Sequence, residues 1–185
     1  MPFKTLGQKI QYHGHAFDVA LVHVQLPDGR ERNYDLVKHN DSITVLPVGS
    51  SGEVYFVNQH RIGAGRDLLE LPAGVQEENE APLTCAKREI REEIGLAAGT
   101  FKKLGGFYLA PGYAEEYMTV FLATDLYDSP LEADADEFLD VKSFPIKEVY
   151  QKALAGEIHD GKTLAALLLA QPLLNNCGDF WVKPA

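Results

Sequence analysis

Residues 74–96 read GVQEENEAPLTCAKREIREEIGL and contain the strongest helix signal in the chain. Pro82 suits a first helical turn, and Gly95 stands where a helix favours a left-handed residue just past its end. Between them, apolar residues recur at helical spacing, which predicts one face directed to a core: Leu83, Ala86, Ile90 and Ile94. We therefore expect a helix over residues 82–94.

The same helix carries three glutamates on one side. Glu89, Glu92 and Glu93 follow the spacing i, i+3, i+4, so their carboxylates can share a face. Like charges at that spacing destabilise a bare helix, whereas a hard divalent cation such as Mg²⁺ prefers oxygen ligands. Arg88 lies one residue before Glu89 and four before Glu92, where its guanidinium can brace a carboxylate. The pattern predicts carboxylates that one cation orients and that can hold metal ions.

The flanking sequence predicts strands and two further helices. Runs rich in β-branched or apolar residues indicate strands over 16–26, 31–37, 42–48, 53–58, 107–109, 117–124 and 138–143. We expect 42–48 and 53–58 to form a hairpin in a buried sheet, and Pro111-Gly112 to form a turn. Helices are expected over 146–155 and 162–170, the second stopped by Pro172. Strands around one strong helix, with other helices outside, predict a mixed α/β sandwich.

Charge and composition exclude several classes of protein. The chain has 185 residues, with 17 Lys and Arg against 27 Asp and Glu, so that 17 − 27 = −10. A general electrostatic grip on nucleic acid or an anionic membrane is not expected, and an anionic substrate would need locally supplied positive charge, such as a metal ion. Two cysteines, Cys85 and Cys177, cannot form a multi-bridge framework or a four-cysteine zinc site. They are expected to be reduced, and one long-range disulfide between them is the alternative. The first residues lack a signal-peptide pattern and the longest apolar run, 164–170, is too short to cross a bilayer, which predicts a cytoplasmic protein.

The glutamate-rich segment resembles the Nudix box, G-x5-E-x7-R-E-U-x-E-E-x-G-U, where U is a bulky aliphatic residue. The pattern is filled by Gly74, Glu80, Arg88, Glu89, Ile90, Glu92, Glu93, Gly95 and Leu96. Nine such positions coincide by chance on the order of once per billion starting points. The alternative, an acidic solvent-exposed helix, is the usual meaning of a charge run. The resemblance implies a Nudix hydrolase: an α/β/α sandwich with a mixed central sheet that cleaves a nucleoside diphosphate linked to another moiety.

The resemblance also implies a metal site. Mg²⁺ is the expected cofactor, with Mn²⁺ as the alternative. Glu89 and Glu93 would be the main ligands, with contributions from Glu92 and from the carbonyl of Ala73. Glu80 corresponds to a glutamate with a supporting role. In this family, water attacks phosphorus, and cations neutralise the diphosphate and lower the pKa of the water.

Sequences outside the box are similar to the ADP-ribose and ADP-sugar pyrophosphatase branch. They are Gln59-His60-Arg61, Glu70-Leu71-Pro72-Ala73-Gly74, Pro111-Gly112 with Glu116, and the segment 155–164. The resemblance implies that Arg61 binds the diphosphate, Glu116 the distal sugar and Pro111 the substrate, while Tyr34 could line the nucleobase site. Products would be a nucleoside monophosphate and a sugar phosphate. The alternatives are that Arg61 is an ordinary surface arginine and Pro111-Gly112 only a turn.

One departure concerns the catalytic base. This branch usually carries a denser acidic loop, whereas here residues 132–137 read EADADE, with Ala135 where a glutamate often stands. Glu137 is then the best candidate for the base, followed by Asp136 and Asp134. If the loop does not act, a box glutamate such as Glu92 could activate the water instead.

The resemblance further implies a homodimer whose subunits share active sites. Residues 1–40 would form a small N-terminal antiparallel β-sheet used in dimerisation, and residues 41–185 the catalytic domain. The strands before residue 41 are too few to bury a core alone, which fits that role. Two other functions are weighed: hydrolysis of oxidised nucleoside triphosphates or dinucleoside polyphosphates, and a non-catalytic module that senses ADP-ribose. Retention of every box glutamate argues against the silent module, and the sugar-branch flanks argue against the other substrates.

Overall fold

The structure is a computed structural model that describes residues 2–132 and 138–174. It falls into two compact units. The N-terminal unit consists of Met1–Asp41 and Phe107–Met118, and the core unit of Ser42–Gly106 and Thr119–Ala185. Each unit is described by itself.

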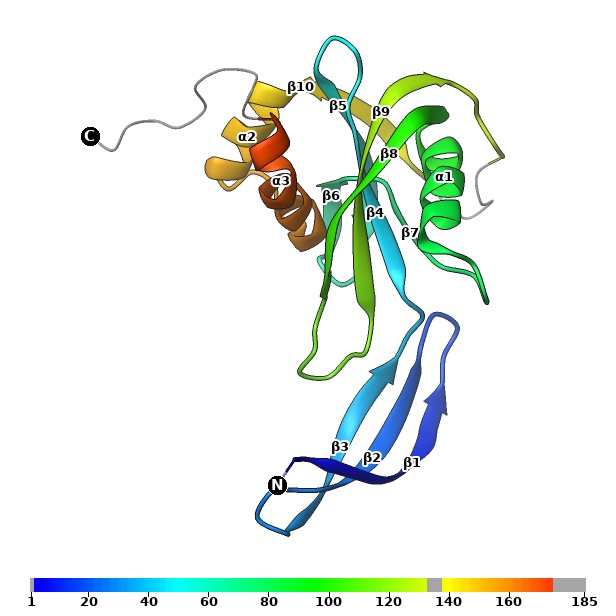
Figure 1. The fold of residues 1–185 in the computed structure, drawn as a ribbon, viewed down its shortest axis with the longest axis vertical. Coiled ribbons are helices and arrows are strands. Elements are labelled where there is room, and N and C mark those ends of the chain that lie inside the picture. The colour runs from blue at the N-terminus through cyan, green and yellow to red at the C-terminus, as the bar shows by residue number, and fades with distance from the viewer. Residues whose placement is uncertain (1, 133–137, 175–185) are drawn as a thin grey trace, which may run out of the picture. The chain divides into compact units, whose positions relative to one another are not determined.

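Two sheets form the centre of the core unit (Figure 1). The four-stranded sheet has the order β7-β4-β9-β8, with β7 at Ala73–Val75, β4 at Ser42–Pro47, β9 at Tyr117–Asp128 and β8 at Leu96–Tyr108. The three-stranded sheet has the order β10-β5-β6, with β10 at Asp140–Pro145, β5 at Glu53–Arg61 and β6 at Arg66–Glu70. Every residue of β4 is buried, as expected for a strand covered on both faces.

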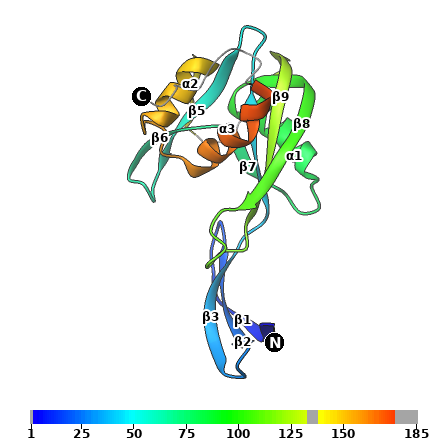
Figure 2. The ribbon, with the colours of Figure 1, turned by 60° about the vertical axis from the view of Figure 1, so that its left-hand side comes forward.

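Helices cover the sheets of the core unit from two sides (Figures 1 and 2). Helix α1 (Pro82–Glu93) packs on β4 and β7, while α3 (Gly161–Leu174) packs on β4 from the opposite side. Helix α2 (Ile146–Leu154) packs on β10 and β5. Of the predicted apolar face of α1, Ala86, Ile90 and Ile94 enter a core cluster on this side of the sheet, whereas Leu83 in the first turn is 40% exposed, against the prediction. The unit is therefore a helix–sheet–helix sandwich.

The helix predictions hold at α1 and fail at the end of α3. Gly95 has φ +72°, the left-handed conformation expected after the last turn of α1. Helix α3 does not stop at Pro172 but continues to Leu174. Pro172 cannot donate the hydrogen bond that the carbonyl of Leu168 would accept in a regular helix. Leu168 itself is 68% exposed, so this part of α3 faces solvent.

Three strand predictions need correction. β4 and β5 do not form a hairpin in one sheet; they share a single bridge, Val48 to Val54, and then enter different sheets. The strand expected at 107–109 is the end of a thirteen-residue strand, β8. Glycines and lysines interrupt the apolar pattern of β8, so its earlier residues were not predicted as a strand. The strand expected over 138–143 begins and ends two residues later, as β10. β1, β6 and β7 were not predicted as separate strands.

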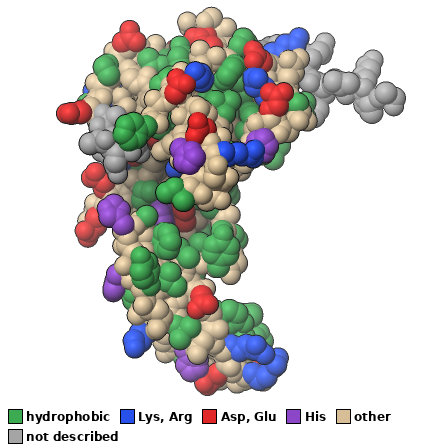
Figure 3. Space-filling view, turned by 180° about the vertical axis from the view of Figure 1, so that it is seen from behind, with side chains coloured by type: hydrophobic (Ala, Val, Ile, Leu, Met, Phe, Trp, Pro, Cys, Tyr) green, Lys and Arg blue, Asp and Glu red, His purple; other side chains and the backbone are tan. Residues whose placement is uncertain are grey.

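The N-terminal unit is an antiparallel sheet of β1 (Lys4–His13), β2 (Asp18–Gln25) and β3 (Glu31–Lys38). Gly29, with φ +86°, makes the predicted turn between β2 and β3. Residues 113–115 join this sheet, because Val37 donates to the carbonyl of Tyr113 and accepts from the N–H of Glu115. Large apolar side chains of the sheet stay exposed (Figure 3), among them Phe3, Tyr12 and Tyr34. In the described part of the chain, the helices are all too short or too polar to cross a bilayer.

Candidate active site

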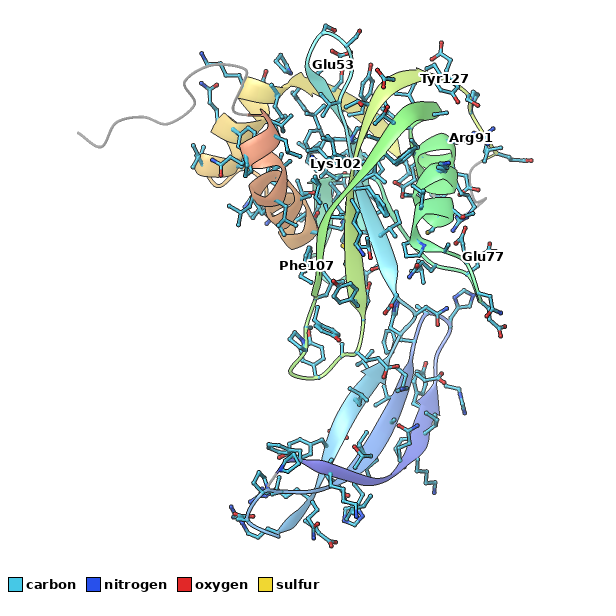
Figure 4. The ribbon with its side chains drawn as sticks, in the orientation of Figure 1. Glu53, Glu77, Arg91, Lys102, Phe107 and Tyr127 are labelled. Atoms are coloured by element: carbon cyan, nitrogen blue, oxygen red, sulfur yellow. The ribbon has the colours of Figure 1, made fainter. Side chains whose placement is uncertain are left out.

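Arg88 contacts three carboxylates, two on α1 and one in the loop before it. Figure 4 labels Glu77 in that loop and Arg91 in the last turn of the helix. Arg88 Nη1 donates to Glu89 Oε1 at 2.8 Å and to Glu92 Oε2 at 2.9 Å. Its Nε and Nη2 donate to the two oxygens of Glu80 at 3.2 and 3.0 Å. The bidentate partner of Arg88 is thus Glu80, from the loop before the helix, rather than one of the helical glutamates. We call these four side chains the Arg88 cluster.

The Arg88 cluster has more carboxylates than its cation neutralises. Three carboxylates and one guanidinium give −3 + 1 = −2. The pKa of Arg88 is raised, chiefly by its hydrogen bond to Glu80, so the guanidinium keeps its charge. The same hydrogen bond lowers the pKa of Glu80 below its usual value. The remaining negative charge suits a divalent cation.

Two neighbouring backbone positions of β7, Ala73 and Gly74, lie against the helical carboxylates. An added Cβ at Gly74 would lie 1.8 Å from Glu89 Oε1, so only glycine leaves room for that carboxylate. The N–H of Ala73 donates to Glu93 Oε2 at 3.0 Å, which places the end of Glu93 beside β7. Glu89 and Glu93 are both buried although they are acidic. Burial of a carboxylate is costly unless it is paired or binds a metal.

The donor set fits a hard divalent cation. Glu89, Glu92 and Glu93 offer carboxylate oxygens, which Mg²⁺ and Mn²⁺ both accept. In the part of the chain that the structure describes, no three His, Cys, Asp or Glu side chains converge on one metal position. The carboxylates instead face Arg88 and the N–H of Ala73. A carboxylate has lone pairs beyond the one that accepts a hydrogen bond, so these groups can offer oxygen atoms to a cation while they keep these partners.

A second ion cluster surrounds Glu70, whose side chain is 1% exposed. Arg61 Nε donates to Glu70 Oε1 at 2.8 Å, and Nη2 donates to Oε2 at 2.6 Å. Lys162 Nζ, from the first turn of α3, donates to the same Oε2 and lies 3.1 Å from Asp160 Oδ1. Burial alone would raise the pKa of Glu70, but Arg61 and Lys162 hold it below its usual value. We call these four residues the Glu70 cluster.

The Glu70 cluster is tied to the start of α3. Asp160 Oδ2 accepts from the N–H of Thr163 at 3.0 Å and from its hydroxyl at 2.6 Å, as a helix cap does. Thr163 Oγ1 in turn accepts from the N–H of Leu71 at 2.9 Å. The segment Glu70–Ala73 thus runs from the Glu70 cluster to helix α1: Glu70 begins it, and the N–H of Ala73 holds Glu93 of α1 at its end.

Comparison with known proteins identifies the family. The NUDIX domain model matches residues 38–167. The chain is 34% identical to the ADP-ribose pyrophosphatase of Bacillus subtilis (strain 168), over 91% of this chain and 92% of that protein. It is 32% identical to the ADP-ribose pyrophosphatase of Mycobacterium tuberculosis (strain ATCC 25618 / H37Rv), over 90% of this chain and 82% of that protein.

The chain belongs to the Nudix family. Its fold agrees, because the crystal structure of an ADP compounds hydrolase, at 22% identity, matches 96% of this chain and 97% of that one with a TM-score of 0.86. The predictions of a Nudix α/β/α sandwich and of a Nudix hydrolase are therefore confirmed. The Arg88 cluster is part of the Nudix box of this chain, to which Gly74 and Glu93 also belong.

Structure places the other predicted residues in different parts of the Nudix protein. Arg61 lies in the core unit and is paired with Glu70. Tyr34, Pro111 and Glu116 belong to the N-terminal unit. Glu116 lies 3.7 Å from His39 Nδ1, Tyr34 is exposed on β3, and Pro111 stands in the predicted turn, where Tyr113 donates to the carbonyl of Ala110. Glu137, the predicted base, lies outside the described residues, as do Asp134 and Asp136.

Lys162, Asp160 and Glu70 had no predicted role in the site. A usable signal was present, because a lysine in the first turn of an apolar helix opposes the helix dipole. Such a lysine is expected to have a specific acidic partner, and Lys162 has two. A different signal, the buried cysteine of α1, has a packing explanation: burial raises the pKa of the Cys85 thiol, so it stays neutral.

Proposed function

We propose that this protein hydrolyses the diphosphate bond of ADP-ribose or a related nucleoside diphosphate sugar, with Mg²⁺ as the cofactor. The products are a nucleoside monophosphate and a sugar phosphate. The observation that carries the proposal is the Arg88 cluster, four side chains of a complete Nudix box with a formal charge of −2, in a chain similar to ADP-ribose pyrophosphatases over nine-tenths of its length.

Glu89, Glu92, Glu93 and the Ala73 carbonyl would hold the cation. A bound Mg²⁺ supplies charge neutralisation at the diphosphate and lowers the pKa of a water. Because Ala73 and Glu93 are already joined by a hydrogen bond, the backbone and helical ligands come from adjacent positions. Mn²⁺ has the same preference for oxygen and would be held by the same set.

The chain's own groups would carry out the remaining steps. The water oxygen forms a bond to one phosphorus, the phosphorus–oxygen bond of the anhydride breaks, and the bridging oxygen leaves with the other phosphate. A carboxylate accepts the proton of the water, and Glu92 and Glu137 are the two candidates. Arg88 holds Glu92 at 2.9 Å, which fixes the direction of that carboxylate.

Arg61 would bind the diphosphate, since a guanidinium matches phosphate oxygens in charge and geometry. Glu116 would accept hydroxyl hydrogens of the distal sugar, and Tyr34 would stack on the nucleobase, with Pro111 in the substrate-binding turn. We also propose that two copies of the chain associate through the N-terminal sheet and share active sites. The exposed apolar side chains Phe3 and Tyr12 on that sheet support this role.

A substrate panel tests the activity. ADP-ribose, GDP-mannose, ADP-glucose and UDP-glucose are compared by specificity constant with Mg²⁺ and with Mn²⁺, and the products are separated by chromatography. We expect AMP and a ribose phosphate from ADP-ribose, and loss of turnover with EDTA. Release of inorganic pyrophosphate from a nucleoside triphosphate as the main reaction would overturn the proposal. Light scattering on a size-exclusion column tests the dimer, and a monomer mass at micromolar concentration would exclude it.

A further inference from the structure

Lys162 stands in an unfavourable place for a cation. Its side chain is 9% exposed, and it lies in the first turn of α3, where the helix dipole repels positive charge. Two carboxylates compensate for the cost of placing a charge there. Glu70 accepts a hydrogen bond from Nζ of Lys162, and Asp160 Oδ1 lies 3.1 Å from the same atom. Burying this lysine costs free energy, and an apolar residue at the same position would stabilise the helix better. The lysine is therefore expected to have a role other than helix formation.

The charges of the Glu70 cluster show what Lys162 supplies. Glu70 and Asp160 carry −2, while Arg61 and Lys162 carry +2, so the cluster is neutral as a whole. Without Lys162 its charge is −1, and Arg61 becomes the only cation in the cluster to compensate two carboxylates. An arginine fully neutralised in this way attracts an anionic ligand poorly. With Lys162 present, Glu70 has a second cation, and the guanidinium of Arg61 keeps part of its attraction for an anion.

Arg61 is placed to use that attraction. Its side chain is 42% exposed, whereas Glu70 beneath it is buried. Glu70 occupies its Nε and Nη2 edge, and a guanidinium has further N–H donors outside that edge. The charge of Glu93, in the Nudix box, also contributes to the raised pKa of Arg61, after the hydrogen bond to Glu70.

We propose that Lys162 is a positioning residue: it compensates the buried charge of Glu70 so that Arg61 can bind the diphosphate of the substrate. The inference rests on the proposed function, because it assumes an anionic diphosphate beside Arg61. Lys162 acts through Glu70 and Arg61 and is itself too buried to be the main contact of the ligand. Asp160 has the opposite effect, because it competes with Glu70 for the charge of Lys162.

Two substitutions should therefore change binding in opposite directions. Lys162→Met keeps the length of the side chain and removes its charge, so we expect the Kd for ADP-ribose to rise about tenfold, as for the loss of one charge near a partly buried site. Asp160→Asn keeps a residue that caps helices well and removes the competing charge. We expect it to lower the Kd by roughly twofold to threefold. A role limited to holding α3 in place predicts weaker binding in both variants.

Calorimetry with ADP-ribose in EDTA measures these Kd values without turnover, and steady-state kinetics with Mg²⁺ gives KM and kcat separately. Lys162→Met should raise KM about tenfold and change kcat less than about threefold. Lys162→Arg should restore most of the binding because it keeps the charge. Lys152→Met is the matched control: Lys152 also pairs with two carboxylates, Glu148 and Glu157, but on α2, and its loss should leave Kd unchanged.

A double-mutant cycle with Arg61→Met shows whether Lys162 acts through Arg61. We expect Lys162→Met to add little to the Kd in the Arg61→Met background. The inference would be overturned if the effects of the two substitutions on Kd were fully additive, or if Asp160→Asn bound ADP-ribose more weakly than the wild type. In either case, turnover by the wild-type protein would leave the proposed function standing. If Lys162→Met does not fold in a thermal unfolding scan, the direction of the Asp160→Asn effect decides. If the wild-type protein neither binds nor cleaves any sugar of the panel, the proposed function is overturned and this inference with it.

Discussion

The two ion clusters of the core unit use the same kinds of side chain in opposite proportions. In the Arg88 cluster, one guanidinium holds three carboxylates, which leaves −2. In the Glu70 cluster, two cations surround one deeply buried carboxylate, and Asp160 brings the whole to neutrality. The first is built on one helix and the loop before it. The second joins a β-hairpin to the start of a helix 92 positions further along the chain.

The difference indicates which ligand charge each cluster can accept. A cluster with surplus carboxylates gains from a cation, and an exposed arginine whose carboxylate partner has a second cation gains from an anion. A metal-dependent hydrolase of a diphosphate needs a site that attracts a cation and a site that attracts an anion, next to each other. The four residues Glu70–Ala73 carry the Glu70 cluster at their start and hold Glu93, a further glutamate of the Nudix box, at their end. Substitutions in either cluster test this division of charge.

The largest effect is expected from Glu93→Gln, which removes a carboxylate from the predicted metal set at little change in volume. Metal-ion catalysis stabilises transition-state charge by several kcal/mol, so kcat/KM should fall about a thousandfold. The amide of Gln can still accept from the N–H of Ala73, so the fold should be retained. Kinetics at several Mg²⁺ concentrations measure the loss, with Glu148→Gln on α2 as the control. Turnover near that of the wild type would refute a ligand role for Glu93.

Glu70→Gln breaks the other cluster and should act mainly on stability. Arg61 and Lys162 would face a neutral amide, and loss of one partner of a buried ion pair costs about 3 kcal/mol or more. For a chain of this size the unfolding midpoint should fall by roughly 6 to 12 °C. The exposed pair of Glu148 and Lys152 gives the control, because Glu148→Gln should change the midpoint by about 1 °C or less. Equal shifts in both variants would show that the Glu70 cluster is no stronger than a surface pair.

Local signals explain how well the sequence predicted α1 and its cluster. Pro82, the apolar spacing and Gly95 all describe one continuous segment, and the helix begins and ends within one residue of the prediction. Arg88, Glu89 and Glu92 are within one helical turn, so their contacts follow from helix geometry. Family resemblance added the meaning of the pattern but was not needed to place it.

Long-range pairing explains what the sequence did not predict. The partner of Glu70 in α3 is 92 residues away, and nothing local to either residue specifies the other. β4 and β5 were expected to pair because a tight turn joins them, yet each finds a better-covered place in a different sheet. The regular pattern of β8 was hidden by glycines and lysines at positions that the strand leaves partly exposed. In each case tertiary packing overrides a local signal.

Gly74→Ala tests whether the space beside Glu89 matters to the Arg88 cluster. The added Cβ would overlap the Glu89 carboxylate at 1.8 Å, so that side chain must leave its place between Gly74 and Arg88. Overpacking of this kind costs about 1 to 3 kcal/mol, and we expect kcat/KM to fall by about tenfold to a hundredfold. Gly7→Ala on β1 is the control, because nothing lies within 4 Å of the added atom. An active Gly74→Ala enzyme would show that Glu89 has another productive position.

The smallest expected effect concerns Glu80, which links the Arg88 cluster to the loop before α1. Its hydrogen bond to Arg88 lowers its pKa in the folded protein, so its stabilising contribution is present above the ordinary value of 4.5 and is lost as the pH falls through the lower folded value. Glu80→Gln lacks this contribution and should be about 1 kcal/mol less stable at pH 7, which corresponds to a midpoint roughly 2 to 4 °C lower. Thermal unfolding of both proteins between pH 7 and pH 3 measures the difference, which should shrink at the acid end because protonated Glu80 resembles Gln. A difference that stays constant across this range would mean that it does not come from the charge of Glu80, and that the hydrogen bond to Arg88 stabilises the folded protein no more through a carboxylate than through a protonated carboxyl group.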